Sequence, residues 1–142
     1  MKLLSATEKQ TQKIGQKLAL GLKDGDILCL YGELGAGKTT MVKGLAKGLG
    51  IKKEINSPTF ALMNIYKTKT RLKTVSLVHI DTYRLKNDQE LIDIGAEDYL
   101  GAPDTICVVE WPEKIKNLLK NKKTVKIVME YEGKKKRIIT IT

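Results

Sequence analysis

The first part of the chain shows the spacing of an amphipathic helix. Ile14, Leu18 and Leu22 recur every four residues, which places them on one face of a helix. Residues 5–8, Ser-Ala-Thr-Glu, fit a capping box, in which a hydroxyl residue and an acidic residue three positions later bond the free N–H groups of a helix start. The sequence therefore predicts a helix that begins near Ala6.

A strand and a second helix follow, with a glycine-rich segment between them. The apolar run at residues 27–31, Ile-Leu-Cys-Leu-Tyr, is typical of a buried strand and ends directly at Gly32. From residue 38 to residue 49 the apolar side chains again recur on one helical face. This order predicts a strand, a tight loop and a helix in direct succession.

The second half of the chain is richer in strand patterns. Apolar runs bounded by turn residues predict two hairpins, one over residues 60–80 and one about the turn at 132–134, with a buried strand between them. The expected strands cover residues 61–66, 74–80, 105–109, 124–131 and 136–142.

Short helical segments are expected between these strands. Residues 87–100 are predicted to form short helices that break at Gly95 and Gly101, and Pro112 suits the first turn of a helix that ends near Lys120. Strand–helix crossovers mixed with hairpins imply a three-layer α/β domain with a mixed parallel and antiparallel sheet, and the phosphate-loop motif described next makes this domain similar to P-loop NTPases. The length of 142 residues fits a single domain over 1–142.

The glycine-rich segment matches a phosphate-binding loop. Residues 32–39, Gly-Glu-Leu-Gly-Ala-Gly-Lys-Thr, satisfy the pattern G-x-x-x-x-G-K-[ST] in full. Glycines let the backbone turn tightly and expose successive N–H groups, and the helix start adds unpaired donors and a partial positive charge. Lys38 is expected to reach the outer phosphates of a nucleoside triphosphate, and the Thr39 hydroxyl is expected to ligate Mg²⁺.

Two carboxylates stand directly after predicted strands, where α/β sheets bind their ligands. Asp81 follows the strand at 74–80, and it could hold Mg²⁺ directly or through a water molecule, or cap a helix. Glu110 follows the strand at 105–109, and it could ligate Mg²⁺, orient the attacking water, or lie at a surface edge.

Three further side chains have both a functional and a structural interpretation. Thr59 lies in a loop where a switch threonine can sense a γ-phosphate through Mg²⁺, or it is a turn residue. His79, the only histidine, is by itself best explained as a packed or hydrogen-bonded strand residue. Arg84 could clamp a phosphate, contact a partner, or pair with the acidic segment at 88–98.

Composition narrows the class of protein. The net charge of +10, from 26 basic and 16 acidic residues, favours an anionic partner such as nucleic acid. Only three of the basic residues are arginine, however, and no aromatic stacking motif accompanies them, so scattered lysine can also be a solvated surface.

Cysteine usage and hydropathy indicate a cytosolic protein. Cys29 and Cys107 each lie within an apolar run, where a buried core thiol is expected rather than a disulfide or a metal ligand. The sequence has neither an apolar stretch of eighteen residues nor the apolar region of a signal peptide, so no membrane span is expected.

Four motifs together resemble a known family. They are Gly-Glu-Leu-Gly-Ala-Gly-Lys-Thr-Thr at 32–40, Ser-Pro-Thr-Phe at 57–60, His-Ile-Asp-Thr-Tyr-Arg at 79–84 and Glu-Trp at 110–111. In order and spacing they are similar to the bacterial ATPases of tRNA threonylcarbamoyladenosine biosynthesis, the TsaE or YjeE family. The likeness spans essentially the whole chain, and one departure from it is Thr82, where an apolar residue is more usual.

The resemblance implies a small Mg²⁺-dependent ATPase, weak alone, that works with a threonylcarbamoyl-transferase subunit and its companion subunit. Hydrolysis of ATP is implied to reset that complex between turnovers of tRNA modification, and direct contact with tRNA stays open. By position, Asp81 is the carboxylate of the second nucleotide motif, an adenine contact falls near Glu8 or Thr11, and a basic contact falls near residues 135–137. His79, Tyr83 and Arg84 also gain functional weight.

The site residues implied in this way share one property, which is proximity to Mg·ATP. They comprise the catalytic side chains Lys38, Thr59, Asp81 and Glu110, the Mg²⁺ ligands Thr39, Asp81 and Glu110, and the nucleotide-binding residues Glu8, Thr11, Gly32, Glu33, Leu34, Gly35, Ala36, Gly37, Lys38, Thr39, Thr40 and Arg137.

Three other functions compete with this hypothesis. A small-molecule P-loop kinase would surround the transferred phosphate with several arginines, which this chain lacks. A GTPase would carry Asn-Lys-x-Asp near a late strand, and residues 121–124, Asn-Lys-Lys-Thr, lack the aspartate. A binding module gated by ATP, in which hydrolysis is incidental, is also compatible with the motifs.

Overall fold

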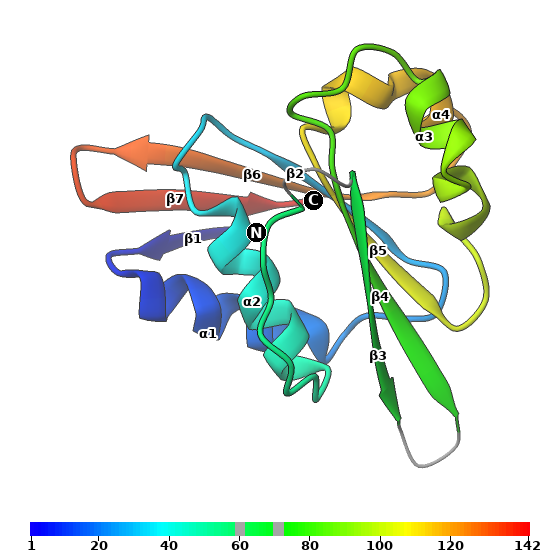
Figure 1. Cartoon of the computed structure of the whole chain (residues 1–142). Helices are drawn as coiled ribbons and strands as arrows, with labels where there is room; N and C mark the ends of the chain where they lie inside the picture. Colours follow the sequence, from blue (N-terminus) through cyan, green and yellow to red (C-terminus); the bar gives the residue numbers. More distant parts are fainter. Residues whose placement is uncertain (59–61, 70–72) are drawn as a thin grey trace.

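The computed structural model describes residues 1–58, 62–69 and 73–142. Over these residues the chain forms seven strands, four α-helices and two short 3-10 helices, which Figure 1 shows. The strands are β1 Lys2–Ser5, β2 Ile27–Tyr31, β3 Met63–Lys69, β4 Thr74–Asp81, β5 Thr105–Glu110, β6 Val125–Glu132 and β7 Lys136–Ile141. The helices are α1 Glu8–Ala19, α2 Lys38–Gly48, α3 Gln89–Asp93, η1 Ala96–Tyr99, η2 Pro112–Ile115 and α4 Lys116–Leu119.

The described strands form one mixed sheet in the order β1-β7-β6-β2-β5-β4-β3. The central strand β2 pairs in parallel with β5 and β6, and β4 pairs in parallel with β5. The hairpins β3–β4 and β6–β7 are antiparallel, as is the edge pair β1–β7. This arrangement confirms the predicted mixed sheet and both predicted hairpins.

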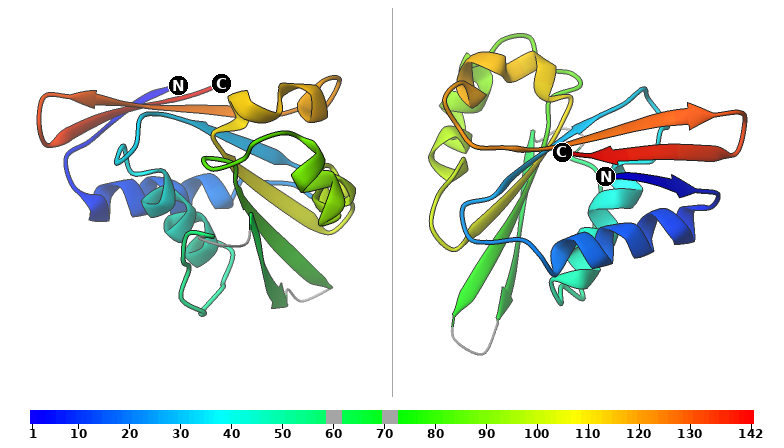
Figure 2. Two further views of the ribbon diagram at one scale, coloured as in Figure 1. Left: turned by 45° about the horizontal axis from the view of Figure 1, so that its top comes forward. Right: turned by 180° about the vertical axis from the view of Figure 1, so that it is seen from behind.

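Helices cover both faces of the sheet and give the three expected layers (Figures 1 and 2). Strand side chains alternate between the two faces, so Leu28 and Leu30 of β2 pack in one core with α1 and α2. Their neighbours Ile27 and Cys29 pack in a second core with α3, η1 and η2. The continuous apolar run of β2 is therefore explained by burial on both sides.

Close packing of α1 on α2 brings the start of α1 beside the phosphate-loop helix. A Cβ atom on Gly44 of α2 would lie 2.3 Å from the carbonyl oxygen of Gln12, and one on Gly15 of α1 would lie 2.7 Å from that of Met41. Only glycine permits these contacts, because a side chain at either position would force the helices apart.

The predicted start of the first helix was wrong. The helix begins at Glu8, with Thr7 as its N-cap: the Thr7 hydroxyl accepts a hydrogen bond from Gln10 N (3.1 Å), and Gln10 Oε1 accepts one from Ala6 N (2.6 Å). Thr7 therefore caps the helix start, and the Gln10 side chain bonds back to the residue that precedes the cap. Ser5 instead ends β1, a strand that the sequence analysis did not predict because Leu3 and Leu4 form too short an apolar run.

Other predicted boundaries need smaller corrections. The strand expected at 61–66 is β3, Met63–Lys69, and residue 61 lies outside the described residues. The segment after Pro112 begins as the tighter 3-10 helix η2 before it continues as α4. Residues 89–99 form the short helices α3 and η1, and the left-handed Gly95 separates them as expected.

Candidate nucleotide site

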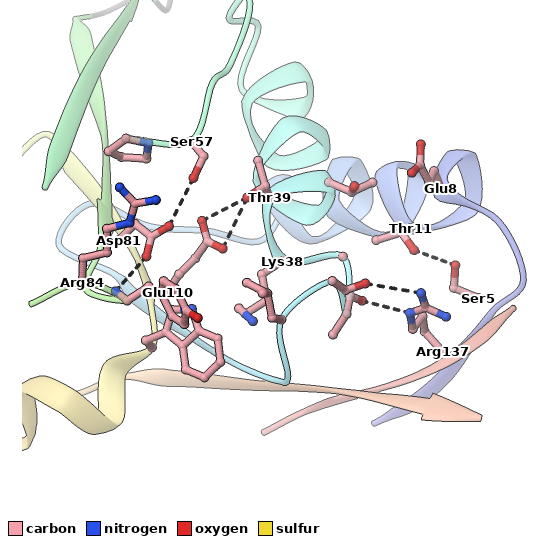
Figure 3. Close-up of a pocket in the computed structure, with 18 of the residues that line it drawn as sticks. Ser5, Glu8, Thr11, Lys38, Thr39, Ser57, Asp81, Arg84, Glu110 and Arg137 are labelled. Atoms are coloured by element: carbon pink, nitrogen blue, oxygen red, sulfur yellow. Dashed lines mark hydrogen bonds between the residues drawn. The ribbon is translucent and has the colours of Figure 1, made fainter. Parts of the chain in front are cut away.

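A cavity of about 570 Å³ opens at the carboxyl ends of β2, β4 and β5. The phosphate loop forms one side, the start of α1 and the β6–β7 hairpin lie beside it, and the segment before β3 covers another side (Figure 3). Most of the predicted site residues line this one cavity, namely Glu8, Thr11, Leu34, Gly35, Ala36, Gly37, Lys38, Thr39, Thr40, Asp81, Glu110 and Arg137.

The loop between β2 and α2 has a backbone that glycine alone adopts easily. The φ angles are +156° at Gly32, +80° at Gly35 and +100° at Gly37. Gly37 is also the N-cap of α2, and it offers no side chain to bond the free N–H groups there. The start of this helix therefore faces the cavity with unpaired donors, which is how helix starts bind phosphate.

Lys38 is held in the loop by two carbonyl groups and by an aromatic ring. Its Nζ atom donates hydrogen bonds to Gly32 O (2.6 Å) and Glu33 O (2.9 Å), and it lies 4.1 Å from the ring centroid of Trp111. Burial lowers the pKa of the Lys38 ammonium, and the nearby carboxylates of Glu110 and Asp81 act in the opposite direction. The Lys38 ammonium therefore lies between loop carbonyl groups, with two carboxylates nearby.

Thr39, Asp81 and Glu110 bring oxygen atoms to one corner of the cavity. The Thr39 hydroxyl lies 3.3 and 3.4 Å from the two carboxylate oxygens of Glu110. Asp81 and Glu110 are register partners at the ends of adjacent parallel strands. This set of hard oxygen donors beside the phosphate loop fits Mg²⁺, which binds through one or two carboxylates together with phosphate oxygens.

Two hydrogen bonds fix the direction of the Asp81 carboxylate. Its Oδ1 atom accepts a hydrogen bond from Tyr83 N (3.0 Å), and its Oδ2 atom accepts one from the Ser57 hydroxyl (3.2 Å). Ser57 belongs to the motif at 57–60, so this bond links that motif to the carboxylate. Thr59 itself lies outside the described residues.

His79 contacts Glu110 directly behind the cavity. Its Nε2 atom lies 2.5 Å from Glu110 Oε2, and the side chains are 0% and 4% exposed. The expectation of a packed and hydrogen-bonded histidine is confirmed. Its partner is one of the predicted site carboxylates, which the isolated sequence position did not indicate.

Trp111 and Thr82 are site residues whose contacts the sequence analysis missed. Trp111 has the left-handed backbone angles φ +60° and ψ +49°, which are costly for a bulky side chain. The buried Thr82 hydroxyl shares its one proton between Trp111 O (2.6 Å) and Glu110 O (3.0 Å) and so stabilises this turn. The ring of Tyr83 lies 5.2 Å from that of Trp111. Thr82, which stands where the family usually has an apolar residue, was the feature of the sequence that could have indicated these contacts.

The other residues singled out from the sequence have defined positions in the structure. Gly32 and Glu33 are not among the residues that line the cavity, and their carbonyl groups accept hydrogen bonds from Lys38. Arg84 lines the cavity, and within the described ranges it forms no ion pair with the acidic segment at 88–98. Cys29 and Cys107 are free and buried, as expected. Among residues 1–58, 62–69 and 73–142, no helix has the length and apolar character needed to cross a membrane.

Comparison with known proteins gives a consistent result. Residues 5–139 match the family model described as threonylcarbamoyl adenosine biosynthesis protein TsaE. The tRNA threonylcarbamoyladenosine biosynthesis protein TsaE of Bacillus subtilis (strain 168) is 37% identical over 142 residues, which is 100% of this chain and 85% of that protein. The protein of the same name from Treponema pallidum (strain Nichols) is 39% identical over 115 residues, which is 81% of each chain.

A solved structure shows the same architecture. The crystal structure of Bacillus subtilis YdiB superposes with a TM-score of 0.79 at 31% sequence identity, and the match covers 99% of this chain and 83% of that one. The likeness confirms the predicted P-loop NTPase-like α/β fold.

Proposed function

This chain belongs to the TsaE family, which is involved in tRNA threonylcarbamoyladenosine biosynthesis, and we propose that it acts there as a Mg²⁺-dependent ATPase. Its partners are a threonylcarbamoyl-transferase subunit and its companion subunit, which modify tRNA in the cytoplasm. Binding and hydrolysis of ATP reset their complex between turnovers.

One observation carries the proposal. A complete phosphate-binding loop, the buried Lys38, the hydroxyl of Thr39 and the carboxylates of Asp81 and Glu110 all meet in a single cavity. A structural role alone does not explain a buried lysine at a glycine-rich helix start beside two carboxylates, because burying this charge costs free energy that a bound phosphate would repay.

Each group has a definite task in this proposal. The N–H groups at the start of α2 and the Lys38 ammonium bind the β- and γ-phosphates. Glu110, which His79 holds from behind, orients the attacking water or ligates Mg²⁺, and Asp81 ligates Mg²⁺ directly or through water. Bound Mg²⁺ would neutralise charge that develops on the phosphate oxygens. Thr59 acts as the switch residue for the γ-phosphate.

One hydrogen bond near the cavity supports a proposed relay from the nucleotide to a partner. Ser57 bonds Asp81, and Ser57 and Pro58 both line the cavity. A change at the Asp81 carboxylate on binding of Mg·ATP therefore reaches the segment 57–60 through one hydrogen bond. We propose that this segment is ordered by the triphosphate, docks on the transferase complex, and is released on hydrolysis.

Two variants separate binding from chemistry. Lys38→Ala is expected to abolish ATP binding, measured by equilibrium dialysis with labelled ATP. Glu110→Ala is expected to keep most of the binding and to lose most of the hydrolysis. Lys116→Ala and Glu97→Ala change the same charges at exposed positions away from the cavity and serve as controls. Unchanged hydrolysis in Glu110→Ala would show that the role proposed for Glu110 is wrong.

A further inference from the structure

The β6–β7 hairpin is packed unusually tightly against the phosphate loop. A Cβ atom on Gly32 would lie 2.7 Å from Met129 O, and one on Gly35 would lie 2.9 Å from the Tyr131 hydroxyl. Met129 and Tyr131 are two residues apart on β6, so their side chains lie on the same face of the strand. Gly32 therefore leaves no room for a side chain beside the hairpin backbone, and Gly35 lies against the tip of the Tyr131 side chain.

Side chains of the hairpin also bond the carbonyl groups of three successive loop residues. The Tyr131 hydroxyl donates to Leu34 O (3.3 Å). The Arg137 guanidinium donates to Gly35 O from Nη2 (3.4 Å) and to Ala36 O from Nε (3.2 Å). Figure 3 shows the two arginine bonds as dashed lines that run from Arg137 to the loop.

Tyr131 and Arg137 form one unit. They are register partners across the antiparallel β6–β7 pair, and the guanidinium carbon lies 3.9 Å from the centroid of the tyrosine ring. This cation–π contact limits how far the guanidinium can turn from the loop. The same register joins Arg137 to Ser5 of β1, whose hydroxyl lies 2.7 Å from that of Thr11 at the side of the cavity.

We propose that Tyr131 and Arg137 are positioning residues that hold the phosphate loop in the shape that binds the triphosphate. In a trans peptide the C=O group of one residue and the N–H group of the next point in opposite directions. Bonding of Leu34 O and Ala36 O by the hairpin therefore turns the N–H groups of Gly35 and Gly37 away from it. The loop is shaped before the ligand arrives, so less ordering entropy opposes binding.

This inference rests on the proposed ATPase function for its ligand, but its first test does not. The guanidinium is already bonded to two carbonyl groups and stacked on a ring, so it acts on the triphosphate through the loop. The alternative is that Arg137 contacts the phosphates as a free positive charge. The two roles predict different results for two variants. Tyr131→Phe removes an uncharged hydroxyl group, and Arg137→Lys keeps the positive charge but loses the guanidinium.

The first experiment measures hydrogen exchange of the Ala36 and Met41 backbone amides in the nucleotide-free protein, because these amides bond Glu33 O (3.0 Å) and Gly37 O (2.9 Å) and so report whether the loop keeps its shape. Tyr131→Phe, Arg137→Lys and Arg137→Gln are compared with the natural chain, and Lys134→Gln removes one charge from the exposed turn of the same hairpin as a control. Faster exchange is expected in the first three variants and not in Lys134→Gln. Lysine keeps the charge but cannot bond two carbonyl groups in one plane, so it should not rescue Arg137. Thermal unfolding shows that each variant is folded.

The second experiment measures the dissociation constant for ATP and the turnover at saturating ATP. Loss of one or two hydrogen bonds to the loop is expected to weaken ATP binding about five- to tenfold, with a smaller effect on turnover at saturating ATP. Loop exchange equal to that of the natural chain in Tyr131→Phe and Arg137→Gln would overturn the proposal. So would full rescue by Arg137→Lys, which would show that charge alone matters. Failure of all hydrolysis would overturn the proposed function and leave the exchange result standing.

Discussion

The Nε2 atom of His79 lies 2.5 Å from the Oε2 atom of Glu110, and both side chains are buried. In the tautomer that carries its proton on Nε2, the imidazole donates this hydrogen bond to the carboxylate. Within the described part of the chain, the other ring nitrogen, Nδ1, has no hydrogen-bond partner. The ring therefore makes its one hydrogen bond there to a carboxylate of the candidate site, and it fixes the direction of that carboxylate.

Replacement of His79 should lower the turnover number more than the affinity for ATP. We expect His79→Leu to reduce kcat about 10- to 100-fold, because Glu110 loses its orienting donor. His79→Gln places an amide nitrogen near the position of Nε2 and should restore part of the loss. Steady-state kinetics and direct binding distinguish the two effects. Equal activity in the leucine, glutamine and natural proteins would contradict this role.

ATP binding should change the emission of Trp111, the only tryptophan of the chain. The Lys38 ammonium lies 4.1 Å from the centroid of its ring, so a triphosphate that draws this charge away alters the surroundings of the indole. A saturable change in fluorescence is expected on titration with Mg·ATP, and Lys38→Ala should abolish it. A flat titration under conditions where dialysis detects binding would show that Lys38 and Trp111 stay together.

Thr82→Val should destabilise the protein although the two side chains have nearly the same shape. The Thr82 hydroxyl bonds Glu110 O and Trp111 O in a buried position, and valine would leave these bonds unmade. We expect the free energy of unfolding to fall by about 1–3 kcal/mol. Urea denaturation measures this change, and Thr82→Ser, which keeps the hydroxyl, is the matched control. Equal stability of valine and threonine at this position would show that the two bonds contribute nothing.

The two thiols should react slowly in the folded protein. Burial raises the pKa of Cys29 from 9.0 to about 11 and that of Cys107 from 9.0 to about 12, and the thiolate is the reactive form. Labelling with a chromogenic disulfide at pH 8 should be slow until urea unfolds the chain. Rapid labelling of one thiol in the native protein would show that its burial is wrong.

The same pKa values set the sign of a pH effect on stability. Below pH 8 both thiols are protonated whether the chain is folded or unfolded, so they leave stability unchanged. As the pH rises above about 9 the unfolded chain ionises first, and the free energy of unfolding should fall through pH 11. A double Cys→Ala variant should lose this part of the alkaline decline.

Local sequence patterns predicted most of the fold because most helices and strands have a recognisable run or spacing of apolar residues. The apolar run at 27–31 and the glycines at 32, 35 and 37 specify a strand and a loop over a few residues, and the structure has both. The short strand β1 has no such signature. It is stabilised by pairing with β7, more than a hundred residues later, and by the contact between Ser5 and Thr11.

The cavity could be predicted as a set of residues but not as a set of contacts. The motifs placed Lys38, Asp81 and Glu110 at the same edge of the sheet, because parallel strands end together. They did not indicate that Tyr131 and Arg137 bond the phosphate loop across about a hundred residues. Such contacts depend on the register of the β6–β7 hairpin and on its place next to β2, which only the folded sheet determines.

The most direct test is the rate of ATP hydrolysis by the purified protein, measured alone and then with the threonylcarbamoyl-transferase subunit and its companion. We expect a low rate alone, a marked rise on addition of the two proteins, and loss of both rates in Lys38→Ala. A rate that the transferase pair leaves unchanged would contradict the proposed reset of that complex, and it would favour a free-standing hydrolase or a small-molecule kinase.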